Sequence, residues 1–158
     1  LAKQLALYVT MFSPLQMAAD LPENYEAHLD AFQFIKDVAL DWDQSIYVEA
    51  EPGAYITVAR KAKNTENWFV GAITNEMGRE AKVSLAFLNK DQKYLATIYK
   101  DSKTADWKNN PEDYQIEQFI VSQKNQLNVV LAMGGGMAVS LKPVTSTTAI
   151  KGIKTLKK

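Results

Sequence analysis

From Trp42 onward, apolar and polar residues alternate with a period of two, and this pattern restricts the fold more than any other feature. Gly, Asn and Asp interrupt the alternation at intervals of about ten residues, which is typical of antiparallel sandwiches and barrels. The pattern predicts a mainly β fold, an antiparallel, Greek-key-like β-sandwich of about eight strands. The strands are expected over Ser45–Glu51, Ala54–Lys61, Asn67–Thr74, Ala81–Phe87, Lys93–Lys100, Tyr114–Val121, Gln126–Ala132 and Met137–Lys142.

Turn-forming residues separate the predicted strands. Pro52-Gly53, Asn75–Gly78 and Asn89–Gln92 favour chain reversals. A phosphate-binding loop would lead from a strand into a helix, whereas another strand follows Gly134–Gly136, so we interpret these glycines as a tight turn. The long segment Asp101–Asp113 interrupts the hairpin rhythm, and we expect it to cross from one sheet to the other.

The first part of the chain follows a different pattern. Apolar residues cover most sides of the segment Leu1–Phe12, which predicts a helix buried against a larger body. Pro14 ends this helix, because proline disfavours helical geometry in the residue before it. The compact apolar run Leu15–Ala19 then predicts a short buried strand of a parallel sheet. Because the chain begins with Leu1 inside the predicted helix, we expect an upstream segment to be missing.

A second helix is expected between Glu23 and Ala39. Asp30 could cap its regular part. Helix, buried strand and helix in succession are the pattern of an α/β layer, and one such strand cannot form a sheet alone. The apolar face of this helix is expected to carry Leu29, Phe32, Ile35 and Val38.

Composition excludes several classes of function. Lys plus Arg and Asp plus Glu both number 18, so no net field attracts the chain to nucleic acid or anionic lipid. No apolar stretch reaches the roughly 20 residues that a membrane-spanning helix needs. The sequence has no cysteine, which excludes disulfides and thiolate metal sites. The C-terminal lysines Lys151, Lys154, Lys157 and Lys158 are interpreted as a frayed, solvated tail.

Few side chains suggest chemistry. His28 is the only histidine, which argues against a zinc cluster or a Ser-His-Asp triad, and we interpret it as an ordinary loop or helix residue. Trp42, Trp68 and Trp107 could offer flat faces to sugar rings, although large aromatic rings are usually buried in a domain of this size. Trp68 is expected in the core, whereas Trp107, in the polar long segment, is the better candidate for exposure.

Five segments of the sequence closely resemble the C-terminal region of glycoside hydrolase family 97, in the same order and over nearly the whole chain. The resemblance implies that residues 1–41 are the C-terminal end of a (β/α)8 catalytic barrel, residues 42–143 a C-terminal β-sandwich domain and residues 144–158 a flexible tail. The strand Leu15–Ala19 would then be the last barrel strand. The five segments are Ser13–Tyr25, Asp30–Val38, Asn67–Thr74, Ala105–Pro111 and Gly134–Gly136.

The resemblance further implies a parent enzyme that is either a calcium-dependent inverting α-glucosidase or a retaining α-galactosidase. In both branches the catalytic and calcium-binding carboxylates lie upstream of the matched region, so no catalytic or metal-binding residue is assigned here and any calcium belongs to the parent. The missing N-terminal sandwich and barrel would be partners of this chain. A periplasmic or secreted location follows from the family alone.

Glycoside hydrolysis needs two carboxyl groups that face each other across the scissile bond. Asp20 and Glu23 form the one pair expected near a barrel mouth, where an accessory substrate-binding role competes with capping of the following turn. With Trp107, they are the candidate substrate-binding residues.

Three functions remain open for the chain. It could be the part of a family 97 glycosidase that buttresses the barrel and has no activity alone. It could instead be an autonomous carbohydrate-binding module, or a structural domain without a ligand that self-associates through the exposed surface of the barrel remnant.

Overall fold

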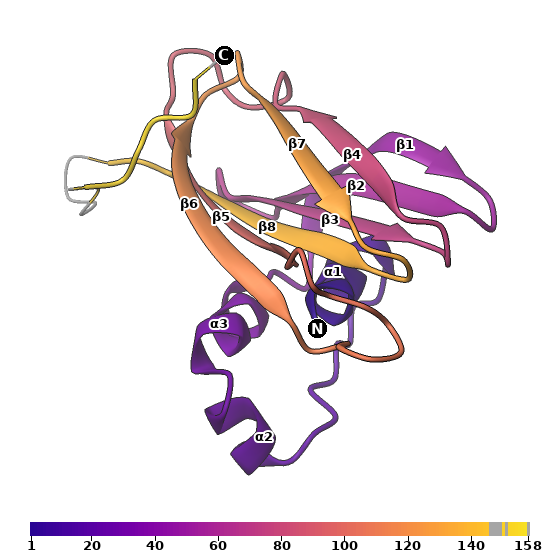
Figure 1. The fold of residues 1–158 in the computed structure, drawn as a ribbon. Coiled ribbons are helices and arrows are strands. Elements are labelled where there is room, and N and C mark those ends of the chain that lie inside the picture. The colour runs from indigo at the N-terminus through magenta and orange to yellow at the C-terminus, as the bar shows by residue number, and fades with distance from the viewer. Residues whose placement is uncertain (146–149, 151, 158) are drawn as a thin grey trace.

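The structure, a computed structural model, describes residues 1–145, 150 and 152–157. Within these residues three helices precede eight strands (Figure 1). The helices are α1 (Ala2–Thr10), α2 (Pro22–Glu26) and α3 (Leu29–Asp37). The strands are β1 (Trp42–Glu51), β2 (Tyr55–Ala62), β3 (Trp68–Thr74), β4 (Arg79–Ser84), β5 (Tyr94–Asp101), β6 (Tyr114–Val121), β7 (Gln126–Leu131) and β8 (Gly136–Pro143).

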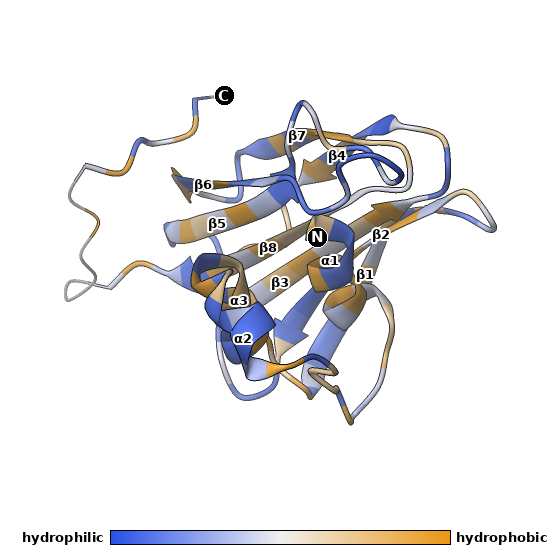
Figure 2. Cartoon of the chain, turned by 60° about the horizontal axis from the view of Figure 1, so that its bottom comes forward, coloured by the Kyte–Doolittle hydropathy of each residue, from blue (hydrophilic) through white to orange (hydrophobic). Residues whose placement is uncertain are grey.

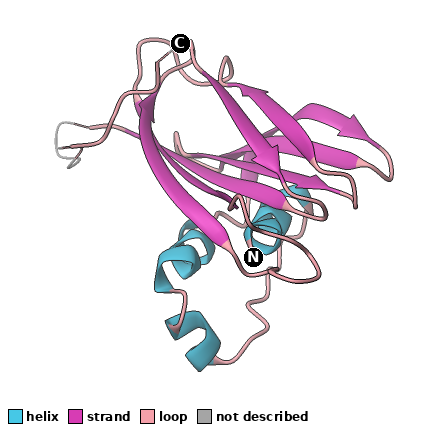
Figure 3. Cartoon of the chain, viewed as in Figure 1, coloured by secondary structure: helices cyan, strands magenta, loops and turns pink. Residues whose placement is uncertain are grey.

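The strands form two antiparallel sheets. The larger has the order β1-β2-β3-β8-β5-β6, and the smaller pairs β4 with β7. The small sheet covers one face of the large sheet, and the helices lie on the other (Figure 3). The predicted antiparallel sandwich is therefore confirmed, and each predicted strand overlaps an observed one.

Hydrophobic side chains pack on both faces of the large sheet. Val70 and Leu141 belong to a core between the two sheets, whereas Phe69 and Ala138 pack against the helices. β3 is buried on both faces, which explains why its sequence is a nearly continuous apolar run. β7 alternates between exposed and buried residues, because one face of the small sheet is solvated.

α1 lies directly on the large sheet, across β3 and β8 (Figure 2). Its buried residues are Ala2, Leu5, Ala6 and Val9, all turned towards the sheet. A Cβ atom on Gly71 would lie 2.7 Å from the Ala6 carbonyl oxygen, so only glycine allows this approach. At the other end of the helix, Arg60 Nε donates to the Val9 carbonyl at 2.7 Å. That bond satisfies one of the carbonyls that a helix C-terminus leaves unpaired, with a cation where the helix dipole favours one.

The strand predicted over Leu15–Ala19 is wrong. Residues 13–20 form an irregular segment in which Leu15 and Met17 are 73% and 72% exposed. No strand lies beside this segment in the described part of the chain, so its backbone N–H and C=O groups have no ladder to join.

The second helix also differs from its prediction. It is divided into α2 and α3, and His28 occupies the N-cap position of α3 without a side-chain capping bond. Asp30 lies inside α3 and does not cap it: Asp30 Oδ1 accepts from the Ala31 amide and from the Tyr114 hydroxyl. The buried residues of α3 are Ala31 and Phe34, because the face that meets the sheet is rotated from the predicted one; Leu29 is 58% exposed.

The segment Asp101–Asp113 does not cross between sheets, which corrects that expectation. It joins β5 to β6, which are neighbours in the large sheet. The crossings are made by shorter connections instead, such as the turn from β6 to β7. The length of the loop suggested a crossing between sheets, but the loop folds on itself through hydrogen bonds within it. Asp113 accepts from the side chains of Ser102, Thr104 and Asn110.

Part of the C-terminal segment bonds to the sheet. Ile120 N donates to Lys154 O at 2.9 Å, and Leu156 N donates to Ile120 O at 3.0 Å. Leu156 also packs against the core between the sheets. A flexible tail was predicted here, but the described residues 152–157 cover the edge of β6; Lys151 and Lys158 lie outside the described residues. Among the described helices, none has the length and apolar character needed to cross a membrane.

The Gly71–Ala6 approach predicts a sharp sensitivity to one methyl group. Gly71→Ala should lower the free energy of unfolding by about 1–3 kcal/mol, because the new Cβ meets backbone and Cβ atoms of α1 that cannot move independently. Urea unfolding measures the loss. Gly78→Ala is the matched control, since its Cβ meets its nearest atom at 3.3 Å. Equal losses in the two variants would contradict the proposed tight contact.

Candidate functional site

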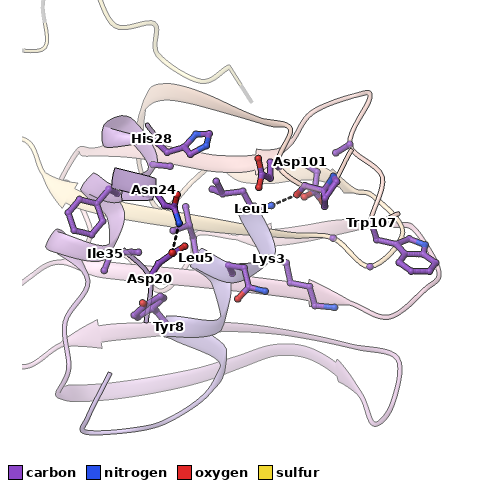
Figure 4. A pocket seen from close by; sticks show the side chains of 18 of the residues that line it. Leu1, Lys3, Leu5, Tyr8, Asp20, Asn24, His28, Ile35, Asp101 and Trp107 are labelled. Atoms are coloured by element: carbon purple, nitrogen blue, oxygen red, sulfur yellow. Dashed lines mark hydrogen bonds between the residues drawn. The ribbon is translucent and has the colours of Figure 1, made fainter. Parts of the chain in front are cut away.

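A cavity of about 920 Å³ lies between the helices and one end of the sandwich (Figure 4). α1 forms its floor, and the segment from Met17 to His28 and helix α3 form one side. The loop residues 105–112 and the β7–β8 turn, residues 132–135, form the other side. The cavity is therefore lined by both parts of the chain, the helical first part and the β-sandwich.

Asp20, one of the predicted substrate-binding residues, lines this cavity but is bonded to its own helix. Asp20 Oδ1 accepts from the Leu21 amide at 2.7 Å and from Asn24 Nδ2 at 2.5 Å. The Asn24 bond, followed by the Leu21 bond, holds the pKa of the Asp20 carboxyl below its usual value. The carboxylate thus bonds beside the start of α2, but the N-cap residue is Leu21 and α2 has no side-chain capping bond, so Asp20 does not cap the helix.

Glu23 and Trp107, the other two predicted residues, do not join Asp20 in one cluster. Glu23 is exposed in the first turn of α2 and is not among the lining residues of the cavity. Trp107 stands at the far rim, and its ring points away from Asp20 (Figure 4). It is 61% exposed, whereas Trp68 is 2% exposed and packs on Phe87, as the sequence predicts for both. A substrate-binding role for the three residues stays a prediction.

Asp101 is a lining residue that sequence reasoning missed. It is 8% exposed, and its Oδ2 accepts from the amides of Ala132 at 3.0 Å and Gly136 at 2.8 Å. A Cβ atom on Gly135 would collide with this carboxylate, so the glycine turn wraps closely around it. Burial, the largest influence, raises the pKa of Asp101 above its usual value, although the two amides oppose the shift. The run of three glycines was the available signal, but the sequence does not show which side chain the turn encloses.

His28 belongs to a contact between α3 and β6. Its Nδ1 lies 3.3 Å from the Tyr114 hydroxyl, which donates to Asp30 Oδ1 at 2.7 Å. Burial and the Asp30 carboxylate raise the pKa of Tyr114 to about 12. In the described part of the chain, no group of three His, Asp or Glu side chains is placed to hold a metal ion. The cavity offers hydrogen-bonding groups and an aromatic rim, which suits binding of a polar ligand.

The family model described as "Glycosyl-hydrolase 97 C-terminal, oligomerisation" matches residues 41–142. The chain belongs to glycoside hydrolase family 97. The match confirms the family that the sequence segments resemble, and it falls on the C-terminal domain of that family. The matched range includes the whole sandwich from β1 to the penultimate residue of β8.

Similar proteins and solved structures support the same family assignment. A retaining alpha-galactosidase from Bacteroides thetaiotaomicron is 38% identical over 140 residues, which are 89% of this chain and 20% of that protein. A family 97 enzyme from Pseudoalteromonas sp. strain K8 is 48% identical, with a TM-score of 0.89 over 91% of this chain and 22% of that one. A β-arabinopyranosidase at 24% identity and a TM-score of 0.70 shares the fold. The family 97 chain thus spans about one fifth of the length of these relatives.

The buried Asp101 carboxylate predicts different outcomes for two substitutions. Asp101→Ala leaves the Ala132 and Gly136 amides without an acceptor and should lower the free energy of unfolding by about 2–4 kcal/mol. Asp101→Asn keeps an acceptor oxygen and removes the buried charge, so its cost at neutral pH should be below about 1 kcal/mol. Urea unfolding at pH 7 compares the two; equal losses would contradict this account.

The same pair tests the direction of the pKa shift. Because the folded pKa of Asp101 is raised above its usual 3.8, the folded state binds the proton more tightly. The contribution of Asp101 to stability is therefore fully present below the unfolded pKa and is lost as pH rises through the folded pKa. The stability of the unsubstituted chain relative to Asp101→Asn should fall as pH rises above about 4. A constant difference from pH 3.5 to 7 would show that the shift is absent.

Proposed function

We propose that this family 97 domain is the end of an α-glycosidase, with residues 1–41 completing its catalytic barrel and the sandwich buttressing that barrel. The observation that carries this proposal is an exposed apolar surface in the first part of the chain. Six large apolar side chains are between 58% and 73% exposed within nineteen residues. They are Met11, Phe12, Leu15, Met17, Leu21 and Leu29.

Such a concentration of exposed apolar surface marks an interface rather than a solvated surface. α1, which precedes these residues, packs on the sandwich through Leu5, Ala6 and Val9. A catalytic barrel is the proposed occupant of the exposed side. Neighbouring barrel strands would also supply the strand pairing that Leu15–Ala19 lacks here, which accounts for the irregular conformation of that segment.

For the substrate, we propose α-linked gluco-oligosaccharides. The 48% identical enzyme from Pseudoalteromonas sp. strain K8 has been solved in complex with acarbose and, as an E480Q variant, with panose. The alternative is an α-galactoside, because the 38% identical relative is a retaining alpha-galactosidase. If the parent is of the inverting α-glucosidase branch, we propose that it binds calcium through residues upstream of this chain. A periplasmic or secreted location is part of the same proposal.

A second function has one observation in its favour. Trp107 is exposed at the rim of a cavity that both apolar and polar side chains line, an arrangement that suits a carbohydrate-binding module. Titration of the isolated chain with malto-oligosaccharides, followed by the heat of binding in a calorimeter, separates the two functions. A saturable change that Trp107→Ala abolishes would support an autonomous module, whereas a flat titration would leave the buttressing role alone.

The proposed division of labour predicts where activity resides. The full-length protein should hydrolyse nitrophenyl α-glucoside faster than nitrophenyl α-galactoside, and the isolated chain should hydrolyse neither, with or without calcium, because hydrolysis needs paired carboxyl groups. Colorimetric assays of both preparations measure this. Clear turnover by the isolated chain would show that the catalytic residues have been misplaced, and a preference for the galactoside would select the alternative substrate.

The proposed barrel interface predicts a second difference between the two preparations. Backbone amides of residues 11–21 should exchange with deuterium at least tenfold more slowly in the full-length protein, because the barrel would cover them. Amides of β3 are the internal control, since the sandwich buries them in both preparations. If residues 11–21 exchanged at equal rates in the full-length protein and the isolated chain, the barrel would not cover this surface.

A further inference from the structure

Trp107 is exposed on a loop that is held rigidly. Asp106 Oδ1 accepts from the amides of Lys108 and Asn109 at 3.1 and 2.8 Å, and Asp106 and Asn110 also exchange two backbone hydrogen bonds. On the other side, Gly134 lets the turn approach the Trp107 side chain: a Cβ atom there would lie 3.2 Å from Trp107 Cβ. The base of the side chain is therefore clamped, while 61% of the residue remains exposed.

A clamped, exposed indole suits ligand binding. Its conformation is fixed before a ligand arrives, so little entropy is lost on binding. The loop also places polar residues around the ring, because Lys108, Asn109 and Glu112 are exposed beside it and Glu112 lines the cavity. A flat apolar face surrounded by hydrogen-bonding groups matches the two kinds of surface that a sugar ring presents.

The position of the loop connects it with the chemistry of the parent. The backbone nitrogen of Leu1, the first residue, donates a hydrogen bond to the Pro111 carbonyl. The loop therefore lies at the N-terminal end of α1 (Figure 4). In a (β/α) barrel each helix begins at the face where the strands end, which is the face that carries the active site. If α1 is a barrel helix, the Trp107 loop lies at the catalytic face.

Asp20 gives a second indication of the same face. It follows Leu15–Ala19, which is irregular in this structure; if neighbouring barrel strands extend that segment, as the proposed function requires, Asp20 lies at its C-terminal end. Asp20 lines the same cavity as Leu1 and Trp107. The helix start and the strand end thus indicate one side of the molecule, the side on which Trp107 is exposed.

We infer that Trp107 is a sugar-stacking platform that the C-terminal sandwich contributes to the substrate site of the parent glycosidase. This inference rests on the proposed function. The platform binds a sugar unit remote from the scissile bond, because it stands at the far rim of the cavity and belongs to a different domain from the barrel. Its ligand is an α-linked oligosaccharide of three or more units, and a nitrophenyl monosaccharide is too short to reach it.

The experiment measures the steady-state kinetics of the full-length protein with two substrates, maltotetraose and nitrophenyl α-glucoside. Trp107→Ala should raise KM for maltotetraose roughly tenfold and leave kcat/KM for the nitrophenyl substrate within about twofold. Trp107→Phe, which keeps a flat ring, should recover most of the loss. Tyr47→Ala is the matched control, because Tyr47 is 65% exposed on the edge strand β1 and does not line the cavity; it should change neither substrate.

Other outcomes overturn the inference in distinguishable ways. Unchanged kinetics of Trp107→Ala with both substrates would remove the platform while the proposed function stands. Equal losses with both substrates, together with a lower Tm, would show that the loop packs against the barrel and does not bind sugar. Absence of turnover by the unsubstituted full-length protein, on glucosides and galactosides alike, would overturn the proposed function and the inference with it.

Discussion

The packing of α1 on the large sheet is the contact on which the rest of the structure depends. The helix has a buried side only because Gly71 lets its backbone come within contact distance of β3, and its C-terminal end is held by Arg60. A single helix of nine residues is marginal in water, so its stability comes from this tertiary contact. With α1 fixed, the chain from Ser13 to Asp37 must cross the same side of the molecule, and the cavity forms beneath it.

The turns at the cavity end of the sandwich are joined into one unit. Gly134 N donates to Asn75 O at 2.7 Å, and Thr74 N donates to Gly135 O at 3.1 Å, so the β3–β4 and β7–β8 turns hold each other. Asp101 then ties the β7–β8 turn to the end of β5. Because these bonds link both sheets, the surface that carries Trp107 is stiff although every part of it is a loop.

The sandwich could be predicted from the sequence because its signals are local. Alternation along a strand and turn residues between strands depend on neighbours in the sequence, and all eight strands followed from them. The wrong predictions depend on distant partners. Leu15–Ala19 has the composition of a buried strand but finds no strand beside it, and the buried side of α3 is set by where Tyr99 and Phe69 meet Phe34. The glycine turn that encloses Asp101 lies 33 to 35 positions later in the sequence. Residue spacing alone does not show that this turn and this carboxylate meet.

The division of the chain into two patterns has a functional meaning that neither pattern shows alone. The sandwich buries its own core, whereas residues 11–29 expose six large apolar side chains. A fold that is self-sufficient in one part and incomplete in the other is suited to hold a second body in a fixed position. Because the cavity lies at the junction of the two parts, the Trp107 loop of the sandwich would reach the substrate in the proposed parent enzyme. Substrate choice would then depend on both domains, and sequence similarity within the barrel alone would be an incomplete guide to it.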